Sequence, residues 1–259
     1  MVKTKLLTFV NAKTIKGEAL GYLTGILYLA PWKTADGKRN VCAQATPGCR
    51  ATCLYTAGRG AYDNVKKARI RKTLEFYRDP QRFAAQIRLD IAVAMEYARK
   101  RRRKYSNGLC IRLNGTSDIP FHHVSFGSPK DGLRLMEMFP FIQFYDYTKD
   151  FQRMLSYLHG YLPTNYHLTF SLSELNLNES ATVLSLGGNV AIVTANGFNL
   201  LENDVPTPLY GAKHFVNGDV DDLRFLDPKG SVCILRAKGR AKHDQTGFVF
   251  RGSEILARS

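Results

Sequence analysis

Short apolar runs, each followed by polar residues and then by a turn or helix signal, recur along the chain and constrain its fold more than any other feature. They lie at residues 25–29, 109–113, 141–145, 167–170, 190–193, 214–216 and 232–235. Runs of this length, rich in branched and aromatic residues, are typical of buried strands in repeated βα units. No change of composition divides the 259 residues. We therefore predict an α/β fold with mostly parallel strands, a full or partial (β/α) barrel formed by residues 1–259 as a single domain.

Helical patterns separate these runs. Asp79 is expected to cap a helix that has Pro80 at its first position, where the missing donor costs nothing. An earlier helix is predicted over residues 63–77, and others near residues 133–138, 150–158 and 179–186. The residues expected to face inward are Val65, Ile70 and Leu74 in the helix over 63–77, and Phe83, Ile87, Ile91, Ala94 and Ala98 in the helix that follows Asp79. Both helices are predicted to cover a sheet.

Polar side chains follow most of the predicted strands. Because the carboxyl ends of parallel barrel strands face one mouth, we expect these residues to converge there. The candidate catalytic residues are Asp118, Asp146, Lys149 and Glu174, and the candidate cofactor-binding residues are Asn114, Ser117 and Ser173. Asp118 and Asp146 have an alternative role as caps of the helices that follow them.

Three cysteines, Cys42, Cys49 and Cys53, lie within twelve residues. The turn residues 46–48 between the first two indicate a wrapping loop, and such a cluster of thiols favours a metal site. A structural zinc normally takes four protein ligands, whereas a [4Fe-4S] cluster can be held by three thiolates. We predict such a cluster, with zinc as the alternative metal. Without a metal, the three cysteines would form one disulfide and leave one free thiol, or they would serve as ordinary small apolar residues.

The chain carries a formal charge of +15, and residues 59–104 hold fifteen Lys and Arg against five Asp and Glu. Six consecutive cations run from Arg99 to Lys104. Such a run is typical of a nucleic-acid surface, and it is equally typical of a solvated helix end. The alternative function is therefore a nucleic-acid-binding protein with a structural metal site.

The first ten residues hold too short an apolar run for a signal peptide, and no later run reaches the length that spans a bilayer. We therefore expect a cytoplasmic protein with no membrane partner. A reducing cytosol keeps thiols available as ligands rather than as disulfides.

Three segments resemble the gene product 88 family of phage and prophage proteins: CRATCLYTAGRGAY at residues 49–62, RLNGTSD at 112–118 and FYDYTK at 144–149. That family is similar in outline to radical S-adenosylmethionine enzymes, whose partial barrels hold a three-cysteine cluster. The resemblance implies a phage-encoded protein in the host cytoplasm, a redox or radical enzyme with S-adenosylmethionine as cosubstrate. The spacing here is Cys-x6-Cys-x3-Cys, whereas those enzymes have Cys-x3-Cys-x2-Cys.

Overall fold

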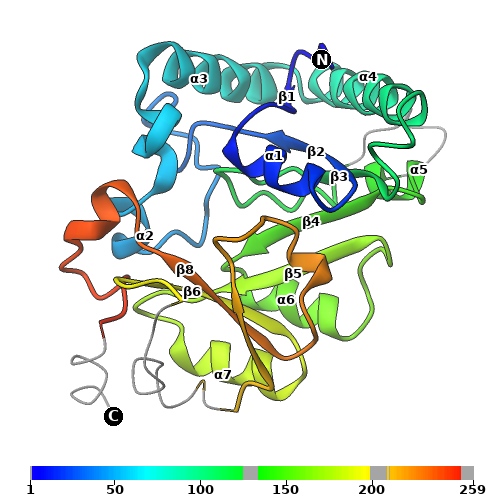
Figure 1. Ribbon diagram of the computed structural model, residues 1–259. Helices are drawn as coiled ribbons and strands as arrows, with labels where there is room; N and C mark the ends of the chain where they lie inside the picture. The colour runs from blue at the N-terminus through cyan, green and yellow to red at the C-terminus, as the bar shows by residue number, and fades with distance from the viewer. Residues whose placement is uncertain (1, 125–133, 199–208, 210, 252–259) are drawn as a thin grey trace. The chain divides into compact units, whose positions relative to one another are not determined.

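The structure of the protein is a computed structural model that describes residues 2–124, 134–198, 209 and 211–251 (Figure 1). Eight strands form its framework. Their order in one sheet is β1-β2-β3-β4-β5-β6-β8-β7. The bounds are β1 (Leu7–Thr8), β2 (Tyr22–Leu27), β3 (Gly108–Arg112), β4 (Gln143–Thr148), β5 (Tyr166–Ser171), β6 (Asn189–Thr194), β7 (His214–Asn217) and β8 (Ser231–Arg236). Strand β1 is antiparallel to β2, whereas the pairings β2–β3, β3–β4, β5–β6, β6–β8 and β7–β8 are parallel. The predicted mostly parallel α/β sheet is confirmed.

The sheet is open. Its edges within the described residues are β1 and β7, which do not pair with each other. A closed barrel requires its first and last strands to pair. Here β1 is only two residues long and antiparallel, and β7 lies outside β8 although it precedes β8 in the chain. The prediction of a full barrel is therefore not met in the part of the chain that the structure describes.

The chain divides into two compact units. The first comprises Met1–Ala43, Asp63–Asp146 and Leu162–His167, and the second comprises Gln44–Tyr62, Tyr147–Tyr161 and Leu168–Ser259. The first unit holds α1 (Ala12–Glu18), α3 (Asp63–Arg78), α4 (Pro80–Arg99) and α5 (Leu135–Met138). The second holds α2 (Pro47–Ala51), α6 (Phe151–Leu158) and α7 (Leu177–Ser185), with the 3₁₀ helices η1 (Leu54–Thr56), η2 (Gly58–Ala61), η5 (Arg224–Leu226) and η6 (Gly239–His243). Residue 133 of the helix predicted near 133–138 lies outside the described residues.

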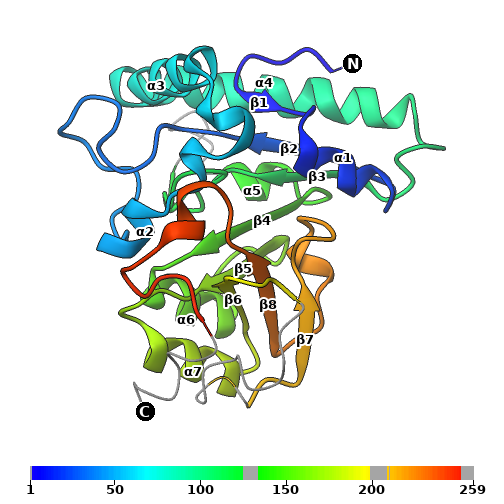
Figure 2. The ribbon, with the colours of Figure 1, turned by 60° about the vertical axis from the view of Figure 1, so that its left-hand side comes forward.

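In the first unit, α4 packs on β2 and β3, and α3 lies in the same layer of helices and contacts α4 (Figures 1 and 2). Helix α4 begins as predicted, because the Asp79 side chain accepts a hydrogen bond from the Arg82 N–H at 2.9 Å. The five apolar residues predicted to face inward from α4 are all buried. Those predicted for α3 are only half-buried. The buried residue of α3 is Thr73, whose hydroxyl accepts the Ala30 N–H at 2.8 Å.

An edge strand that the sequence pattern missed precedes β2. The buried carboxylate of Asp90 on α4 accepts the backbone N–H groups of Lys5 at 3.2 Å, Leu6 at 2.7 Å and Leu7 at 3.0 Å. This side chain therefore fixes β1 against α4. A strand of two residues is too short to produce a detectable alternation of apolar and polar residues.

In the second unit, β6 and β8 pair in register from Val190↔Val232 to Thr194↔Arg236. Helix α7 packs on β6 and lies beside α6, whose N-cap Asp150 accepts the Arg153 N–H at 3.1 Å. A small apolar cluster follows β8, and its buried members are Ala237, Ala241, Phe248 and Val249. Cys49 packs against this cluster, which places one of the three clustered cysteines at the edge of a core. None of the described helices combines the length and the apolar character needed to cross a bilayer.

Candidate metal centre and neighbouring polar residues

The five cysteines fall into two groups by exposure. Cys42, Cys49 and Cys53 are half-buried, whereas Cys110 in β3 and Cys233 in β8 are fully buried. All five, each within the described residues, are thiols rather than disulfides. The predicted disulfide alternative is therefore not what the structure contains. The three clustered thiols are accessible to a metal or a reagent, and the other two belong to the core.

Cys42 is held in the first unit by its sulfur and by its backbone. Its Sγ accepts the Trp32 N–H at 3.4 Å and lies 3.8 Å from the Thr116 carbonyl oxygen. Its own N–H donates to Asn40 Oδ1 at 2.8 Å. Trp32 has φ +49°, in the left-handed region that a bulky residue rarely adopts. Strain of this kind persists only where the surrounding structure enforces it, and it is common at functional sites.

The turn after β3 supports the loop that carries Cys42. The Asp118 N–H donates to the Val41 carbonyl at 2.8 Å, and the Thr116 hydroxyl donates to the Leu29 carbonyl at 2.5 Å. The predicted site residue Asp118 thus lies beside the cysteine loop, within the same unit. The backbone N–H of Asp118 makes this contact.

Three predicted site residues, Asn114, Ser117 and Asp146, do come together. The Asn114 N–H and side-chain amide donate to the two carboxylate oxygens of Asp146 at 2.7 and 3.0 Å, and the Tyr166 hydroxyl donates to one of them at 3.0 Å. Asn114 Oδ1 accepts from the Ser117 hydroxyl at 2.8 Å and from the Ile119 N–H at 2.9 Å. Asn114 and Asp146 are 2% and 1% exposed, so this network braces the turn rather than opening to solvent.

The sequence placed Asp146 after its strand, but it lies inside β4. Burial raises the pKa of its carboxyl group to about 6, against the opposing effects of its hydrogen bonds and of the Arg112 charge. Its alternative role as a helix cap is not observed, because Asp150 caps α6.

In the second unit, Glu174 fixes the short helix that carries Cys49. Its carboxylate accepts the Thr46 hydroxyl at 2.8 Å and the Gly48 N–H at 2.7 Å. Thr46 Oγ1 in turn accepts the Cys49 N–H at 3.2 Å. A Cβ at position 48 would lie 2.7 Å from the Glu174 carboxylate and 2.5 Å from the Thr246 hydroxyl, so a larger residue would displace these side chains. Glu174 therefore acts here as a positioning residue for the cysteine segment.

The two remaining predicted site residues are bonded locally. The Lys149 ammonium donates to the Ser171 hydroxyl at 2.6 Å and lies 5.2 Å from the centre of the Phe248 ring. The Ser173 N–H donates to Asn176 Oδ1 at 2.7 Å, in the turn that leads to α7. Both residues follow strand ends of the second unit, as expected.

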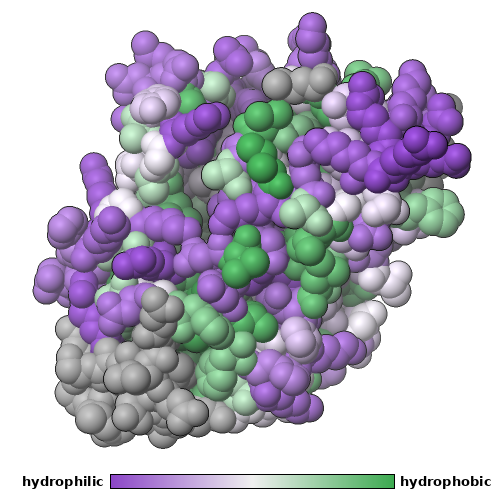
Figure 3. All heavy atoms as spheres, viewed as in Figure 1, coloured by the Kyte–Doolittle hydropathy of each residue, from purple (hydrophilic) through white to green (hydrophobic). Residues whose placement is uncertain are grey.

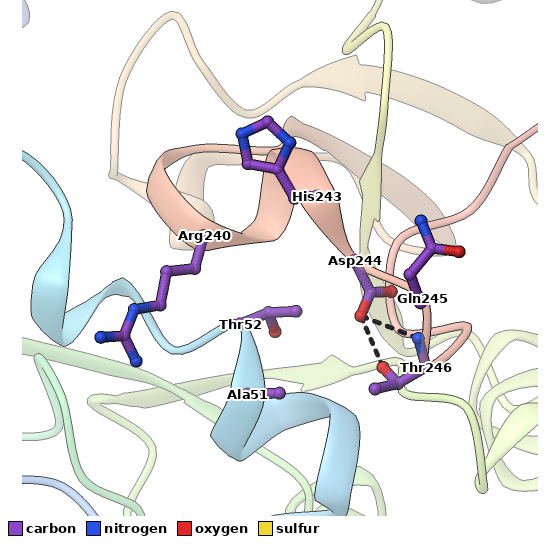
Figure 4. Close-up of a pocket in the computed structure, with 7 residues that line it drawn as sticks. All are labelled: Ala51, Thr52, Arg240, His243, Asp244, Gln245 and Thr246. Carbon is purple, nitrogen blue, oxygen red and sulfur yellow. Dashed lines mark hydrogen bonds between the residues drawn. The ribbon is translucent and has the colours of Figure 1, made fainter.

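A pocket of about 380 Å³ lies beside α2 and was not anticipated from the sequence (Figure 4). Its lining residues are Ala51, Thr52, Arg240, His243, Asp244, Gln245 and Thr246. The Asp244 carboxylate accepts the Thr246 N–H at 3.1 Å and hydroxyl at 2.6 Å, which fixes the wall that follows η6. Two of its lining residues, Ala51 and Thr52, lie between Cys49 and Cys53 in the chain. No motif in residues 239–246 marks this pocket.

Sequence reasoning also missed a buried charge cluster around Arg224, which is 1% exposed. One guanidinium nitrogen donates to Cys233 Sγ at 2.8 Å and lies 3.2 Å from Asp227, and the other pairs with Asp221 at 2.9 Å. Burial raises the pKa of the Cys233 thiol to about 11 despite the guanidinium beside it. This thiol therefore stays protonated and serves the core.

Within the described residues, no group of three or more His, Cys, Asp or Glu side chains is placed to hold a metal ion. Cys42 belongs to the first unit, and Cys49 and Cys53 belong to the second. The three-thiol site therefore stays a prediction from the sequence.

The basic run from Arg99 to Lys104 is partly neutralised by neighbouring carboxylates. Glu96 pairs with Arg99 at 2.7 Å and with Lys100 at 3.3 Å, and Lys104 pairs with Glu18 at 2.7 Å. Hydrogen bonds from Arg99 and Lys100 lower the pKa of Glu96 to about 2. These pairs are those expected of a solvated helix end.

Comparison with known families gives one assignment. The family model described as gene product 88 matches residues 5–252. The chain belongs to the gene product 88 family. Comparison with curated proteins and with solved structures gives no match. The resemblance to the gene product 88 family is thereby confirmed over nearly the whole chain, whereas similarity to radical S-adenosylmethionine enzymes finds no support.

Proposed function

We propose that this member of the gene product 88 family is a phage-encoded iron–sulfur protein in which Cys42, Cys49 and Cys53 bind a [4Fe-4S] cluster. The observation that carries the proposal is the Trp32 N–H directed at Cys42 Sγ from a strained backbone position. An N–H donor stabilises a thiolate, and hydrogen bonds to ligand sulfurs are a principal means of setting cluster potentials.

Two further observations favour ligand roles. The three clustered thiols are half-buried while Cys110 and Cys233 are fully buried, so exposure separates the proposed ligands from core cysteines. Ligand residues also need support from their neighbours, and Glu174 provides it for the helix that carries Cys49.

Three ligands leave one cluster position open. When bound, such a cluster supplies one electron to a small cosubstrate at that position. S-adenosylmethionine is the cosubstrate that the family resemblance implies. Asp118, in the turn after β3, and Lys149, directly after β4, are the proposed catalytic groups, and Ser173 is a proposed cofactor contact.

The decisive experiment is anaerobic purification followed by iron, sulfide and zinc analysis and an absorption spectrum. We expect a brown protein with about four irons and four sulfides per chain. Cys42→Ser, Cys49→Ser and Cys53→Ser should each lose most of the iron, whereas the control Cys110→Ala should keep it. Colourless protein with stoichiometric zinc, or without metal, would reject the proposal.

A second measurement does not depend on the variants folding. In metal-loaded protein, Cys42, Cys49 and Cys53 should be protected from iodoacetamide, and a chelator should expose all three together. Alkylation of these thiols at equal rates before and after chelation would contradict their ligand role.

The cosubstrate is tested separately. Addition of S-adenosylmethionine to reduced protein should change its electron paramagnetic resonance spectrum and produce 5′-deoxyadenosine. An unchanged spectrum at saturating cosubstrate would reject this cosubstrate and leave the cluster assignment standing.

A further inference from the structure

Helix α3 presents a row of cations along one groove of the first unit. The groove measures about 380 Å³, and its lining residues are Lys67, Ile70, Arg71, Leu74, Glu75 and Arg78. Residues at this spacing share one helix face, and Lys67 and Arg78 are about 16 Å apart along the axis at 1.5 Å per residue. Lys67, Arg71 and Arg78 are exposed. Hydrophilic side chains also cover α3 on the face seen in Figure 3.

The other cations of α3 are engaged within the protein. Lys66 pairs with Asp63 at 3.2 Å, the Arg69 guanidinium lies 5.0 Å from the centre of the Tyr28 ring, and Lys72 donates to the Leu6 carbonyl at 2.5 Å. Burial lowers the pKa of Lys72 to about 8.

The three groove cations differ from these. Lys67, Arg71 and Arg78 have no ion-pair partner among the residues that the structure describes. Glu75 lines the same groove and offsets one of the three positive charges. The groove therefore keeps a net positive charge, with Ile70 and Leu74 supplying apolar surface between the cations.

The run after α4, which the sequence marks as the most basic, is a weaker candidate. Glu96 and Glu18 already pair with three of its six cations, and the Arg101 guanidinium lies 3.9 Å from the centre of the Tyr97 ring. Most cations of this run are therefore already engaged in contacts within the protein.

We propose that the α3 groove contacts the phosphates of a nucleic-acid strand through Lys67, Arg71 and Arg78. A span of about 16 Å covers about five phosphates at 3.4 Å per nucleotide of one duplex strand, which is enough for three contacts. Half-buried Ile70 and Leu74 offer contact to sugars or bases without reading sequence. A helix that inserts into a membrane surface instead carries a large apolar face. The groove face of α3 carries three cations and one carboxylate beside its two apolar side chains.

The test compares two variants of equal charge. Lys67→Gln/Arg71→Gln/Arg78→Gln and Arg101→Gln/Arg102→Gln/Arg103→Gln each lower the net charge from +15 to +12. Fluorescence polarisation with single-stranded DNA, single-stranded RNA and duplex DNA of about 20 nucleotides, between about 50 and 200 mM salt, measures affinity and salt dependence.

We expect the native protein to bind at about 150 mM salt and the α3 variant to lose affinity at least tenfold. The slope of log affinity against log salt should flatten by about two to three in the α3 variant, since each lost phosphate contact contributes about 0.7–0.9. The control variant should change both quantities much less, and Glu75→Gln should tighten binding. The arm with the tightest binding identifies DNA or RNA, single or double stranded.

Equal losses in the two triple variants would show that binding follows net charge alone, and would overturn the proposal. So would native protein that fails to bind any of the three nucleic acids at about 150 mM salt, or that binds only anionic phosphatidylserine vesicles. Circular dichroism and thermal melts should match those of the native protein, because all six substituted side chains are exposed.

Discussion

Replacing Asp146 with Asn isolates the contribution of one buried carboxyl group to the pH dependence of stability. The folded protein raises the pKa of this group from 3.8 to about 6, chiefly through burial. The folded state therefore binds more protons than the unfolded state between about pH 4 and 6. Stability from this group is fully present below the unfolded pKa and is lost as the pH rises through the folded pKa.

The magnitude follows from the size of the displacement. Each pKa unit corresponds to about 1.4 kcal/mol, so the rise from 3.8 to about 6 amounts to about 3 kcal/mol. Asp146→Asn removes this titration. The amide of the variant has one acceptor oxygen fewer for the Asn114 and Tyr166 donors. The lost hydrogen bonding lowers the free energy of unfolding by about 1–3 kcal/mol at every pH.

The assay is urea unfolding of native protein and Asp146→Asn at several pH values from about 4 to 7.5. The free energy of unfolding of the native protein, minus that of the variant, should fall by about 3 kcal/mol across this range, most of it below about pH 6.5. A difference that stays constant, or that grows with pH, would refute the reasoning.

Two further substitutions test packing and polar contacts in the two units. Gly48→Ala should destabilise the protein by about 1–3 kcal/mol, because its Cβ would press on Glu174. Gly211 is exposed, and no atom of the described residues lies within 4 Å of a Cβ there, so Gly211→Ala should have no comparable cost; equal thermal melts of the two variants would contradict this. Asp90→Ala should cost about 3 kcal/mol or more, because the N–H groups of Leu6 and Leu7 lose their buried acceptor, and unchanged urea unfolding would disprove it.

Local signals predicted much of the fold. Asp79 with Pro80 marked the start of α4, and the branched apolar runs marked seven of the eight strands, because capping and strand preference act between residues close in the chain. Strand boundaries were predicted less well. The predicted strand over 141–145 ends before Asp146, whereas β4 extends to Thr148, so Asp146 lies inside the strand and is buried.

The surroundings of the cysteines were beyond prediction for a different reason. Glu174 binds Thr46 across 128 residues of sequence, and no local pattern records a contact of that separation. The left-handed backbone of Trp32 is equally invisible, since tryptophan carries no preference for that region. Candidate ligands could be named from spacing, but the residues that position them could not.

The hydrogen bonds between Asp90 and the backbone around β1 also protect the protein against self-association. An edge strand exposes unpaired backbone groups that can recruit another molecule by strand addition. Here the edge strand is only two residues long, and the N–H groups of Leu6 and Leu7 are already occupied by a carboxylate from α4. A buried side chain on a helix thus shields the end of the sheet, and its loss would leave the edge of β2 open to aggregation.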